Sequence, residues 1–424
     1  MKAALLAIPL ALAALVVGAV VIWSLSRAPR HKDAASVPSA AEAAPGDRYA
    51  QAAEDSRRLA RTLVAGDNLA GLSAAVAVNG EIVWAEGFGW AIGDGKTPIT
   101  PRTRFRLGAL SKPFTAMAAA RLHDQGRLDL DAPVQRYVPG YPAKAWPVTT
   151  RQLLGDVAGV HRIRGDNNDA MPTQHCDDVD DAVALLHDDP LQFQPGTKHR
   201  YSIWGWVLVS AAVQGAGGHS FSQVMEREVF EPLGLTRTLV EEPDSADIAN
   251  DAGDRPDYSC VAGGGAFVST PTDLVRLGSA MLKPGFLRAD TIAGFERPTR
   301  LASGASTTYA LGWTVATAQV AGTSQRVISH RGSPRGGAAT LLLFPDLGLA
   351  VAVADNTGGK TGLGPLALEV AGAFARAGTV PRKQTLRALP PSNGPEDLRC
   401  DTRLLPLPCS RPSRSSSGPP QPTT

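Results

Sequence analysis

The residues with the clearest chemical potential lie at the start of an apolar helix, where Lys112 follows Ala109 by three positions. The run from Met117 to Leu122 is almost entirely apolar and ends near Gly126, so we expect a buried helix. Positions 109 and 112 then lie one turn apart and face the same way, near backbone N–H groups that favour negative charge. A serine at position 109 would be a nucleophile beside its own base, but this chain has alanine there.

Two further side chains could transfer protons or bind a ligand. Tyr201 follows a Pro195-Gly196 turn, and a phenol near a lysine ammonium has its pKa lowered, which suits proton transfer. His330 follows the strand-like run Val327–Ser329 and begins the His-x-Gly sequence that ends at Gly332. Taken singly, such a tyrosine is more often a packed aromatic, and a lone His-x-Gly carries little information. The interpretation therefore depends on the whole set.

As a set, these segments resemble a family of serine hydrolases that includes class C β-lactamases, penicillin-binding proteins, D-peptidases, esterases and the mitochondrial lactamase-like protein. Residues 105–116 resemble its Ser-x-x-Lys segment, except at Ala109. Tyr201 stands at the Tyr-x-Asn or Tyr-Ser-x position, and His330 stands at the Lys-Thr-Gly or His-x-Gly position. The segments occur in the family's order, and the resemblance covers about residues 47–378.

Two other segments fit the resemblance, and we expect the second of them to be structural. Leu311-Gly312-Trp313 precedes the third motif as a Gly-Trp strand does in the family. The Gly263–Gly265 run is followed by a helix start, with Thr270 or Thr272 as the candidate N-cap.

The resemblance implies a role for each position. Lys112 would be the base beside the nucleophile, Tyr201 would help to move the proton to the leaving group, and His330 would be the cationic or donor group. The N–H groups of Ala109 and Ser333, which follows Gly332, would form the oxyanion hole, and an alanine side chain leaves both intact. The ligand class that the resemblance implies is a peptide or acyl small molecule, including D-Ala-D-Ala-like peptides.

Three departures bear on catalysis. Ala109 lacks the only atom that could form an acyl-enzyme, and Ser111 cannot easily substitute because it points to another face of the helix. Ile203 stands where asparagine often occurs, and residues 155–160 differ from the family's His-x-Ser-Gly-Ile. Since loss of such a nucleophile costs several orders of magnitude in rate, we expect a catalytically impaired protein that still binds ligands.

Two alternatives stay open. One is an active hydrolase of β-lactamase, D-peptidase or esterase type, either using lysine-activated water or represented by a chain whose serine has been replaced. The other is an interaction or scaffold module with an incidental groove.

The elements that must position these residues suggest one sheet built from both ends of the chain. We expect an α/β (α+β) fold of the β-lactamase/transpeptidase type, in which N- and C-terminal helices flank an antiparallel sheet and a mostly helical insertion covers about residues 105–270. An Asn-Gly hairpin and a Pro-Asp-Leu-Gly hairpin supply the strands. The expected elements are a helix at Tyr49–Leu63, strands at Gly71–Val78, Ile82–Trp84, Gly337–Phe344 and Leu349–Asp355, and a helix at Leu363–Ala377.

The ends of the chain differ from its middle in composition. Ala3 to Leu25 contains no charge and could span a hydrocarbon core of roughly 30 Å, so residues 1–25 are expected to be a membrane anchor, with a cleaved signal as the alternative. The following Arg27, Arg30 and Lys32 favour a cytoplasmic body, which conflicts with the extracytoplasmic or periplasmic location that we expect. Residues 26–46 are expected to be a linker, 47–380 the folded domain and 381–424 a disordered tail rich in Pro and Ser.

The cysteines and the charge balance narrow the function classes. Cys176 with Cys260, and Cys400 with Cys409, could form two disulfides in an oxidising compartment, whereas the alternative is four free thiols. None has the spacing of a zinc site, and we expect no metal and no cofactor. A formal net charge of +2, without a basic run beside aromatic residues, gives no reason to expect a nucleic-acid partner.

Overall fold

The computed structural model describes residues 30–42, 45–92, 95–161, 174–242, 245, 247–250, 256–358 and 362–379. The expected membrane segment, residues 1–25, and the expected tail, residues 381–424, lie outside the described residues. Among the helices in the described ranges, none combines the length and the apolar character needed to cross a membrane.

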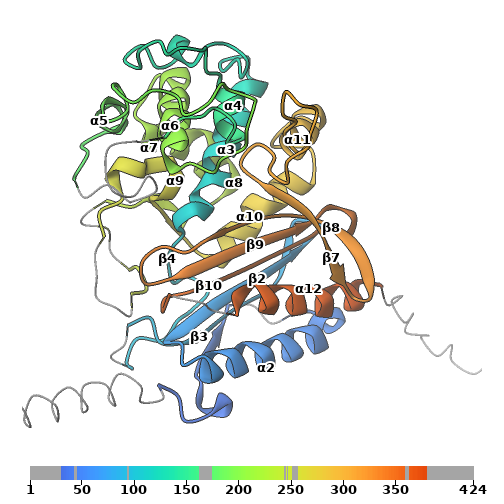
Figure 1. Ribbon diagram of the computed structural model, residues 1–424. Helices are drawn as coiled ribbons and strands as arrows, with labels where there is room; N and C mark the ends of the chain where they lie inside the picture. Colours follow the sequence, from blue (N-terminus) through green and yellow to red (C-terminus); the bar gives the residue numbers. More distant parts are fainter. Residues whose placement is uncertain are drawn as a thin grey trace, which may run out of the picture. The chain divides into compact units, whose positions relative to one another are not determined.

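A seven-stranded antiparallel sheet in the described part of the chain is assembled from both ends of the sequence, as expected. Its strands lie in the order β1-β3-β2-β10-β9-β8-β7 (Figure 1). The two ends meet where β2 pairs with β10, in a register that runs from Leu72 opposite Asp355 to Val78 opposite Leu349. The strands are β1 (Ser39–Ala41), β2 (Gly71–Val78), β3 (Glu81–Gly89), β7 (Thr314–Val320), β8 (Thr323–Gly332), β9 (Ala338–Phe344) and β10 (Leu349–Asp355).

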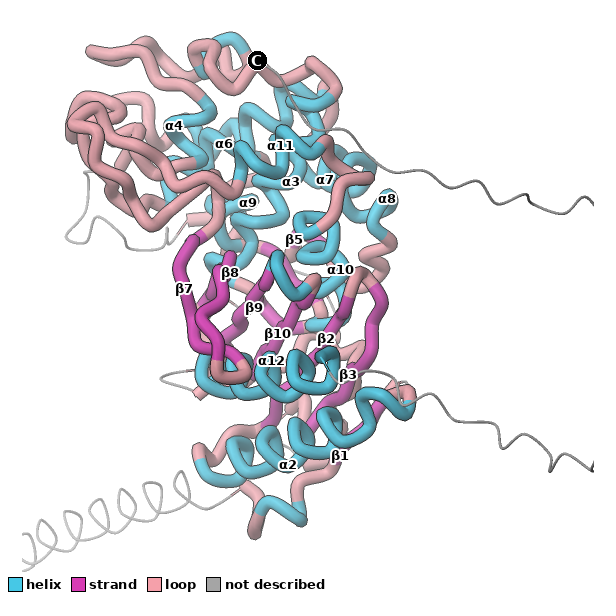
Figure 2. The backbone as a smooth tube through the Cα atoms, turned by 90° about the vertical axis from the view of Figure 1, so that its right-hand side faces the viewer, coloured by secondary structure: helices cyan, strands magenta, loops and turns pink. Residues whose placement is uncertain are grey.

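Helices cover both faces of this sheet. Helices α2 (Ala50–Gly66) and α12 (Leu363–Thr379) pack together on one face, where the Trp84 and Phe374 rings lie 6.0 Å apart between their centroids. Helix α10 (Pro271–Leu282) covers the other face, and Figure 2 shows the sheet between these two layers. Gly278 permits the close approach of α10, because a Cβ atom there would lie 2.4 Å from Leu343. The resulting core is apolar on both sides of the sheet.

The inserted region is mostly helical, as expected, but it also contains a small sheet of β4, β6 and β5. Helices α10 and α11 follow residue 270, and α10 packs on the seven-stranded sheet rather than on the inserted region. The elements are β4 (Phe105–Arg106), α3 (Ser111–Asp124), α4 (Thr150–Leu154), α5 (Val179–Ala184), α6 (Ile203–Gly217), α7 (Phe221–Met225), α8 (Glu231–Leu233), β5 (Leu239–Val240), α9 (Ala262–Gly265), β6 (Phe267–Ser269) and α11 (Ala289–Phe295).

The sheet begins before Asp47, which corrects the expected linker at residues 26–46. Strand β1 pairs with β3, with Ser39 opposite Phe88, and the preceding Val37 is buried in the core. Without β1, the outer edge of β3 would present unpaired N–H and C=O groups to other chains. A short strand of small residues covers that edge at little steric cost.

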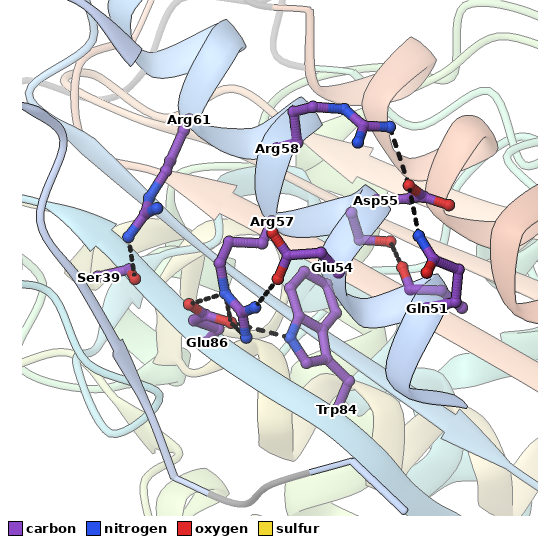
Figure 3. A network of polar contacts seen from close by, with 11 residues as sticks. Ser39, Gln51, Glu54, Asp55, Arg57, Arg58, Arg61, Trp84 and Glu86 are labelled. Carbon is purple, nitrogen blue, oxygen red and sulfur yellow. Dashed lines mark hydrogen bonds and ion pairs between the residues drawn. The ribbon is translucent and has the colours of Figure 1, made fainter. Parts of the chain in front are cut away.

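A buried carboxylate ties α2 to the sheet (Figure 3). Glu86 on β3 is 1% exposed, and Arg57 of α2 donates to it from Nε at 2.8 Å and from Nη2 at 2.9 Å. The indole Nε1 of Trp84 donates a third hydrogen bond, at 3.1 Å. The carboxylate is therefore neutralised and hydrogen-bonded where it is buried.

Replacing Arg57 should destabilise the fold, because Glu86 would stay buried without its counter-charge. We expect Arg57→Met to lower the free energy of unfolding by about 2–4 kcal/mol, measured by chemical denaturation. Arg58→Met is the matched control on the same helix, since the Arg58 side chain is mostly exposed and pairs with Asp55. Its effect should stay within about 0.5 kcal/mol, and equal losses in both variants would contradict the prediction.

Candidate active site

Lys112 is held at the base of the site by the first turn of α3. A 3-10 turn at Gly108–Leu110 contains half-buried Ala109 and leads directly into α3. The Lys112 side chain is 0% exposed, and its Nζ donates to the Gly264 carbonyl at 2.9 Å. Burial lowers the pKa of Lys112 to about 8, and the negative charge of Asp156 opposes this shift.

Ser111 lies on another face of the helix, as expected. Its side chain is fully buried, and its Oγ accepts a hydrogen bond from the Phe267 backbone N–H at 3.0 Å. The hydroxyl is thus committed to the packing of α3 against β6 and cannot serve as the missing nucleophile.

The glycine run at 263–265 lets α9 approach Lys112. A Cβ atom on Gly263 would lie 2.4 Å from Thr115 Oγ1, and one on Gly264 would lie 3.1 Å from the Trp206 Cβ. Larger residues would therefore push away the carbonyl that accepts from Lys112. Thr270 is the N-cap of α10 and accepts from Asp273 N at 3.1 Å, which confirms one of the two expected caps.

Tyr201 covers the lysine. Its ring centroid lies 4.6 Å from Lys112 Nζ, and the residue is 44% exposed. The position follows from the next residue: Ser202 is the N-cap of α6, accepting from Gly205 N at 3.2 Å and donating to the Val160 carbonyl at 2.7 Å. The serine of the Tyr-Ser-x sequence therefore fixes the helix start that presents Tyr201 to Lys112.

His330 on β8 is a neutral imidazole rather than a cation. It is 6% exposed, and burial together with the positive charge of Lys112 lowers its pKa to about 3. Its Nδ1 lies 2.9 Å from the Arg331 carbonyl, which can only accept, so Nδ1 carries the proton. Nε2 then accepts from the Tyr309 hydroxyl at 3.2 Å. Of the two expected roles, cation or donor, burial disfavours the cationic one.

The burial of His330 predicts the direction in which the stability of the protein changes with pH. Because the folded-state pKa of His330 lies below its unfolded value of about 6.5, the unfolded chain binds a proton in that interval that the folded chain does not. The free energy of unfolding should therefore fall as the pH drops from about 6.5 towards 4, by up to about 1.4 kcal/mol per pH unit from this group. Denaturation of His330→Gln should show a correspondingly flatter profile. The exposed His187→Gln is the control, and parallel profiles for all three proteins would refute the assignment.

The end of β8 packs directly on the turn that contains Ala109. A Cβ atom on Gly332 would lie 1.7 Å from the Leu107 carbonyl and 2.9 Å from Leu110 N. Only glycine permits this approach, which brings the backbone at 332 and 333 against the 3-10 turn. Ser333 itself is exposed.

Two buried residues complete the cluster around Lys112. Asp156, just after α4, is 3% exposed, and burial raises its pKa to about 8 against the opposing effects of Lys112, the Ser202 N–H and the Trp206 indole. It has a left-handed backbone with φ of 53°, a conformation that aspartate adopts more readily than most residues other than glycine. Tyr309 is also buried, and burial together with the negative charge of Asp156 raises its pKa well above the usual 10.

Comparison with known proteins identifies the family. The Beta-lactamase family profile matches residues 57–373, which is more than half of the 424 residues. The chain belongs to the β-lactamase family. It is 26% identical over 406 residues to the mitochondrial serine β-lactamase-like protein LACTB of Mus musculus, with 70% of this chain and 73% of that protein covered. It is 26% identical over 301 residues to penicillin-binding protein 4* of Bacillus subtilis (strain 168), with 64% of each chain covered.

A solved class C β-lactamase shares the fold. It superposes with a TM-score of 0.64 at 18% identity, covering 77% of this chain and 97% of that chain. Family membership makes the chain a protein of the serine-hydrolase superfamily. The expected sheet with flanking helices is thereby confirmed as the fold of β-lactamase-like proteins.

Of the residues grouped around Lys112, sequence reasoning named Tyr201 and His330 as site candidates but did not name Asp156 or Tyr309 as such. Asp156 occupies the place of the histidine in the family's His-x-Ser-Gly segment, so this difference from the family's sequence could have marked Asp156 as a candidate site residue. Tyr309 lies two residues before Leu311-Gly312-Trp313, but nothing in that spacing predicts a contact with His330. Chemically, the arrangement offers a buried amine, a buried carboxyl group and two phenols, but no hydroxyl at position 109.

A disulfide joins Cys176 to Cys260, across 84 positions of sequence, which confirms one of the two expected pairs. Cys400 and Cys409 lie outside the described residues. The disulfide fixes the segment before α5 to the segment that leads into α9, and α9 supplies the carbonyl for Lys112.

Breaking this disulfide should lower stability, because it removes a cross-link that restricts the unfolded chain. We expect the double variant Cys176→Ala/Cys260→Ala to lose about 2–4 kcal/mol in free energy of unfolding. Denaturation of the native chain with and without reductant should give the same difference. If reductant leaves the native transition unchanged, the disulfide does not contribute as predicted.

A separate cavity of about 800 Å³ lies beside the small sheet. The Arg106–Glu241 ion pair, with 2.7 Å between Nη2 and Oε1, forms part of its wall, but Ala109, Lys112, Tyr201 and His330 do not line it. Tyr258, another wall residue, accepts from Arg335 N at 3.0 Å, so the cavity adjoins the loop after Ser333.

In the described part of the chain, no cluster of three His, Cys, Asp or Glu side chains could hold a metal ion.

Proposed function

We propose that this β-lactamase-family chain binds peptide or acyl ligands in its retained pocket without forming an acyl-enzyme. The observation that carries the proposal is the half-buried alanine at position 109, one turn before an intact, fully buried Lys112. Alanine has no atom that can be acylated. D-Ala-D-Ala-like peptides are the first ligands to test, because relatives include penicillin-binding protein 4*.

The backbone around position 109 supports ligand binding. Close packing of Gly332 on Leu107 and Leu110 keeps the strand end beside the 3-10 turn, and the amides of Ala109 and Ser333 are the proposed donors for the ligand carbonyl. His330 contributes a neutral imidazole to the same site, and Lys112 a buried amine. In this proposal Tyr201 is the exposed wall that the ligand contacts.

Calorimetric titration of the native chain tests the proposal. A D-Ala-D-Ala peptide and a β-lactam should each give saturable binding, while the β-lactam ring absorbance stays constant. Ala109→Leu should abolish binding by filling the pocket, whereas Ala184→Leu at the exposed end of α5 should bind normally. Absence of saturable binding, or consumption of the β-lactam, would overturn the proposal.

We also infer that the folded domain matures in an extracytoplasmic, oxidising compartment, with residues 1–25 as its membrane anchor. The disulfide between Cys176 and Cys260 supports this inference, since such bonds are rare in reducing compartments. Thiol labelling of the chain in intact cells should leave both cysteines unmodified. Full labelling of Cys176 in its native compartment would contradict it.

A further inference from the structure

The cavity beside the small sheet has a buried arginine in its wall, and this arginine keeps unused hydrogen-bond donors. Arg106 on β4 is 7% exposed and contacts Glu241 from one side, through Nε at 2.9 and 3.0 Å and through Nη2 at 2.7 Å. This side-on contact leaves the two N–H groups of Nη1 directed away from the carboxylate. Among the described residues, none accepts a hydrogen bond from Nη1. A ligand oxygen in the cavity can supply the acceptor that the protein does not.

Tyr258 adds a second buried donor to the same wall. It is 8% exposed, and its hydroxyl oxygen accepts from Arg335 N at 3.0 Å, so that bond does not use the hydroxyl hydrogen. Burial raises the pKa of Tyr258, so the phenol keeps this hydrogen at neutral pH, and the positive charge of Arg106 also acts on it. Two donors, one of them charged, favour a carboxylate oxygen as the acceptor.

The acidic residues of the cavity are placed differently from these donors. Glu241 and Asp257 each already face a basic side chain at 2.7 Å. Glu242 and Asp247 are exposed, and Asp247 has only a loose contact with Arg237, at 3.9 Å. Since exposed residues of a cavity wall belong to its rim, the cavity has donors inside and carboxylates at its mouth. This arrangement fits a ligand with a negative group at its inner end and a positive group at its outer end.

The size and the remaining wall of the cavity limit the ligand further. A volume of about 800 Å³ suits a small molecule. The described wall contains three arginines and four acids, so a ligand with both charges matches it better than a simple anion. Ile92 and two prolines, Pro98 and Pro256, add apolar surface, and Ile92 is 47% exposed. Apolar side chains of a ligand would remove this surface from water.

We propose that the cavity is a second ligand site, separate from the pocket of the proposed function, and that it binds a zwitterionic amino acid or short peptide with apolar side chains. The ligand carboxylate accepts hydrogen bonds from Arg106 and Tyr258. The ligand ammonium group lies at Glu242 and Asp247, and the apolar side chains pack against Ile92. The proposal does not depend on the proposed function, because the two sites have different walls.

Calorimetric titration of the full chain with the dipeptide leucyl-phenylalanine tests the site. The carboxamide form of this dipeptide should bind about tenfold more weakly, because it loses the charged acceptor of two buried donors. The N-acetyl form should bind about threefold more weakly, a smaller loss because the rim acids are solvated. Equal affinities for the three probes would overturn the proposal.

Glu242→Gln tests the rim without disturbing the core, because Glu242 is exposed. The variant should bind the dipeptide about threefold more weakly and the N-acetyl form as the native chain does. Glu81→Gln is the matched control, an exposed acid on β3 that does not line the cavity. An unchanged preference for the free amine in Glu242→Gln would refute the placement of the ammonium group at the rim acids.

Tyr258→Phe removes one donor and keeps the aromatic ring. It should weaken binding of the dipeptide about tenfold, with little further effect on the carboxamide form, which has already lost the charged acceptor. Tyr137→Phe is the matched control, because the Tyr137 hydroxyl accepts from Asp129 N at 2.7 Å in the same way but does not line the cavity. Equal weakening in both variants would show that a lost backbone hydrogen bond, and not a lost ligand contact, is responsible, and the proposal would fail.

Ala109→Leu separates this site from the proposed function. The substitution fills the pocket at position 109, which does not line the cavity, so the affinity for the dipeptide should stay within about twofold of the native value. Loss of dipeptide binding in Ala109→Leu would place the probe in the other pocket and refute this inference. Dipeptide binding by a chain that binds no β-lactam would support this inference and refute only the proposed function.

Discussion

Ala109→Ser should convert the native chain into one that reacts covalently with fluorophosphonate and fluorescent penicillin probes. The substitution adds the single missing oxygen one turn before Lys112, whose lowered pKa of about 8 leaves part of the amine free to accept a proton at neutral pH. The surrounding backbone already has the close contact of Gly332 with the 3-10 turn. We expect labelling to increase by about three orders of magnitude or more, measured by in-gel fluorescence and confirmed by mass mapping to residue 109.

The double variant Ala109→Ser/Lys112→Ala is the control for this gain. It keeps the new hydroxyl but removes the base, and its labelling should return towards that of the native chain. Strong labelling of the native chain would mean that another nucleophile is present. The prediction that the chain is catalytically impaired would then be wrong. An unlabelled but folded Ala109→Ser variant would mean that the other departures from the family's sequence, at Ile203 and residues 155–160, are enough to prevent activation of a serine.

Much of the fold follows from local patterns in the sequence. Asn79-Gly80 predicts the β2–β3 hairpin because these residues adopt positive φ readily, here 53° and 89°. Strand β1 could not be predicted in the same way. Its three small residues have no alternating pattern, and only the unpaired edge of β3, a tertiary feature, gives them a strand partner.

The site was predictable to the extent that its residues sit in recognisable motifs. Lys112, Tyr201 and His330 were found because each stands in a short segment of fixed spacing. Asp156 and Tyr309 stand in no such segment. Their raised pKa values arise because segments far apart in the chain pack together and bury them, which the sequence around each residue does not show. The same physical reason explains why a cationic role was among those expected for His330, since its sequence neighbours do not reveal that Tyr309 and the sheet exclude water from it.

Gly332→Ala should disrupt the site from the side of the sheet. Its Cβ would lie 1.7 Å from the Leu107 carbonyl, far inside any real contact, and the atoms it meets are backbone and cannot move aside cheaply. The strand end and the 3-10 turn must therefore separate, which we expect to lower the free energy of unfolding by about 3 kcal/mol or more. In the Ala109→Ser background, the same change should abolish probe labelling, because the proposed Ala109 and Ser333 donors would no longer face one carbonyl oxygen.

Gly364→Ala on α12 is the matched control for this effect. Gly364 is exposed, no atom lies within 4 Å of the position that a Cβ atom would occupy there, and a helical alanine should add stability of up to about 1 kcal/mol. Opposite signs for the two glycine substitutions would show that close packing at Gly332, and not the loss of glycine as such, is responsible. A Gly332→Ala protein with native stability would mean that β8 and the turn are further apart than the structure indicates. If that protein also kept its labelling in the Ala109→Ser background, the Ser333 amide would have no part in the site, and the carbonyl would be held by the Ala109 N–H alone.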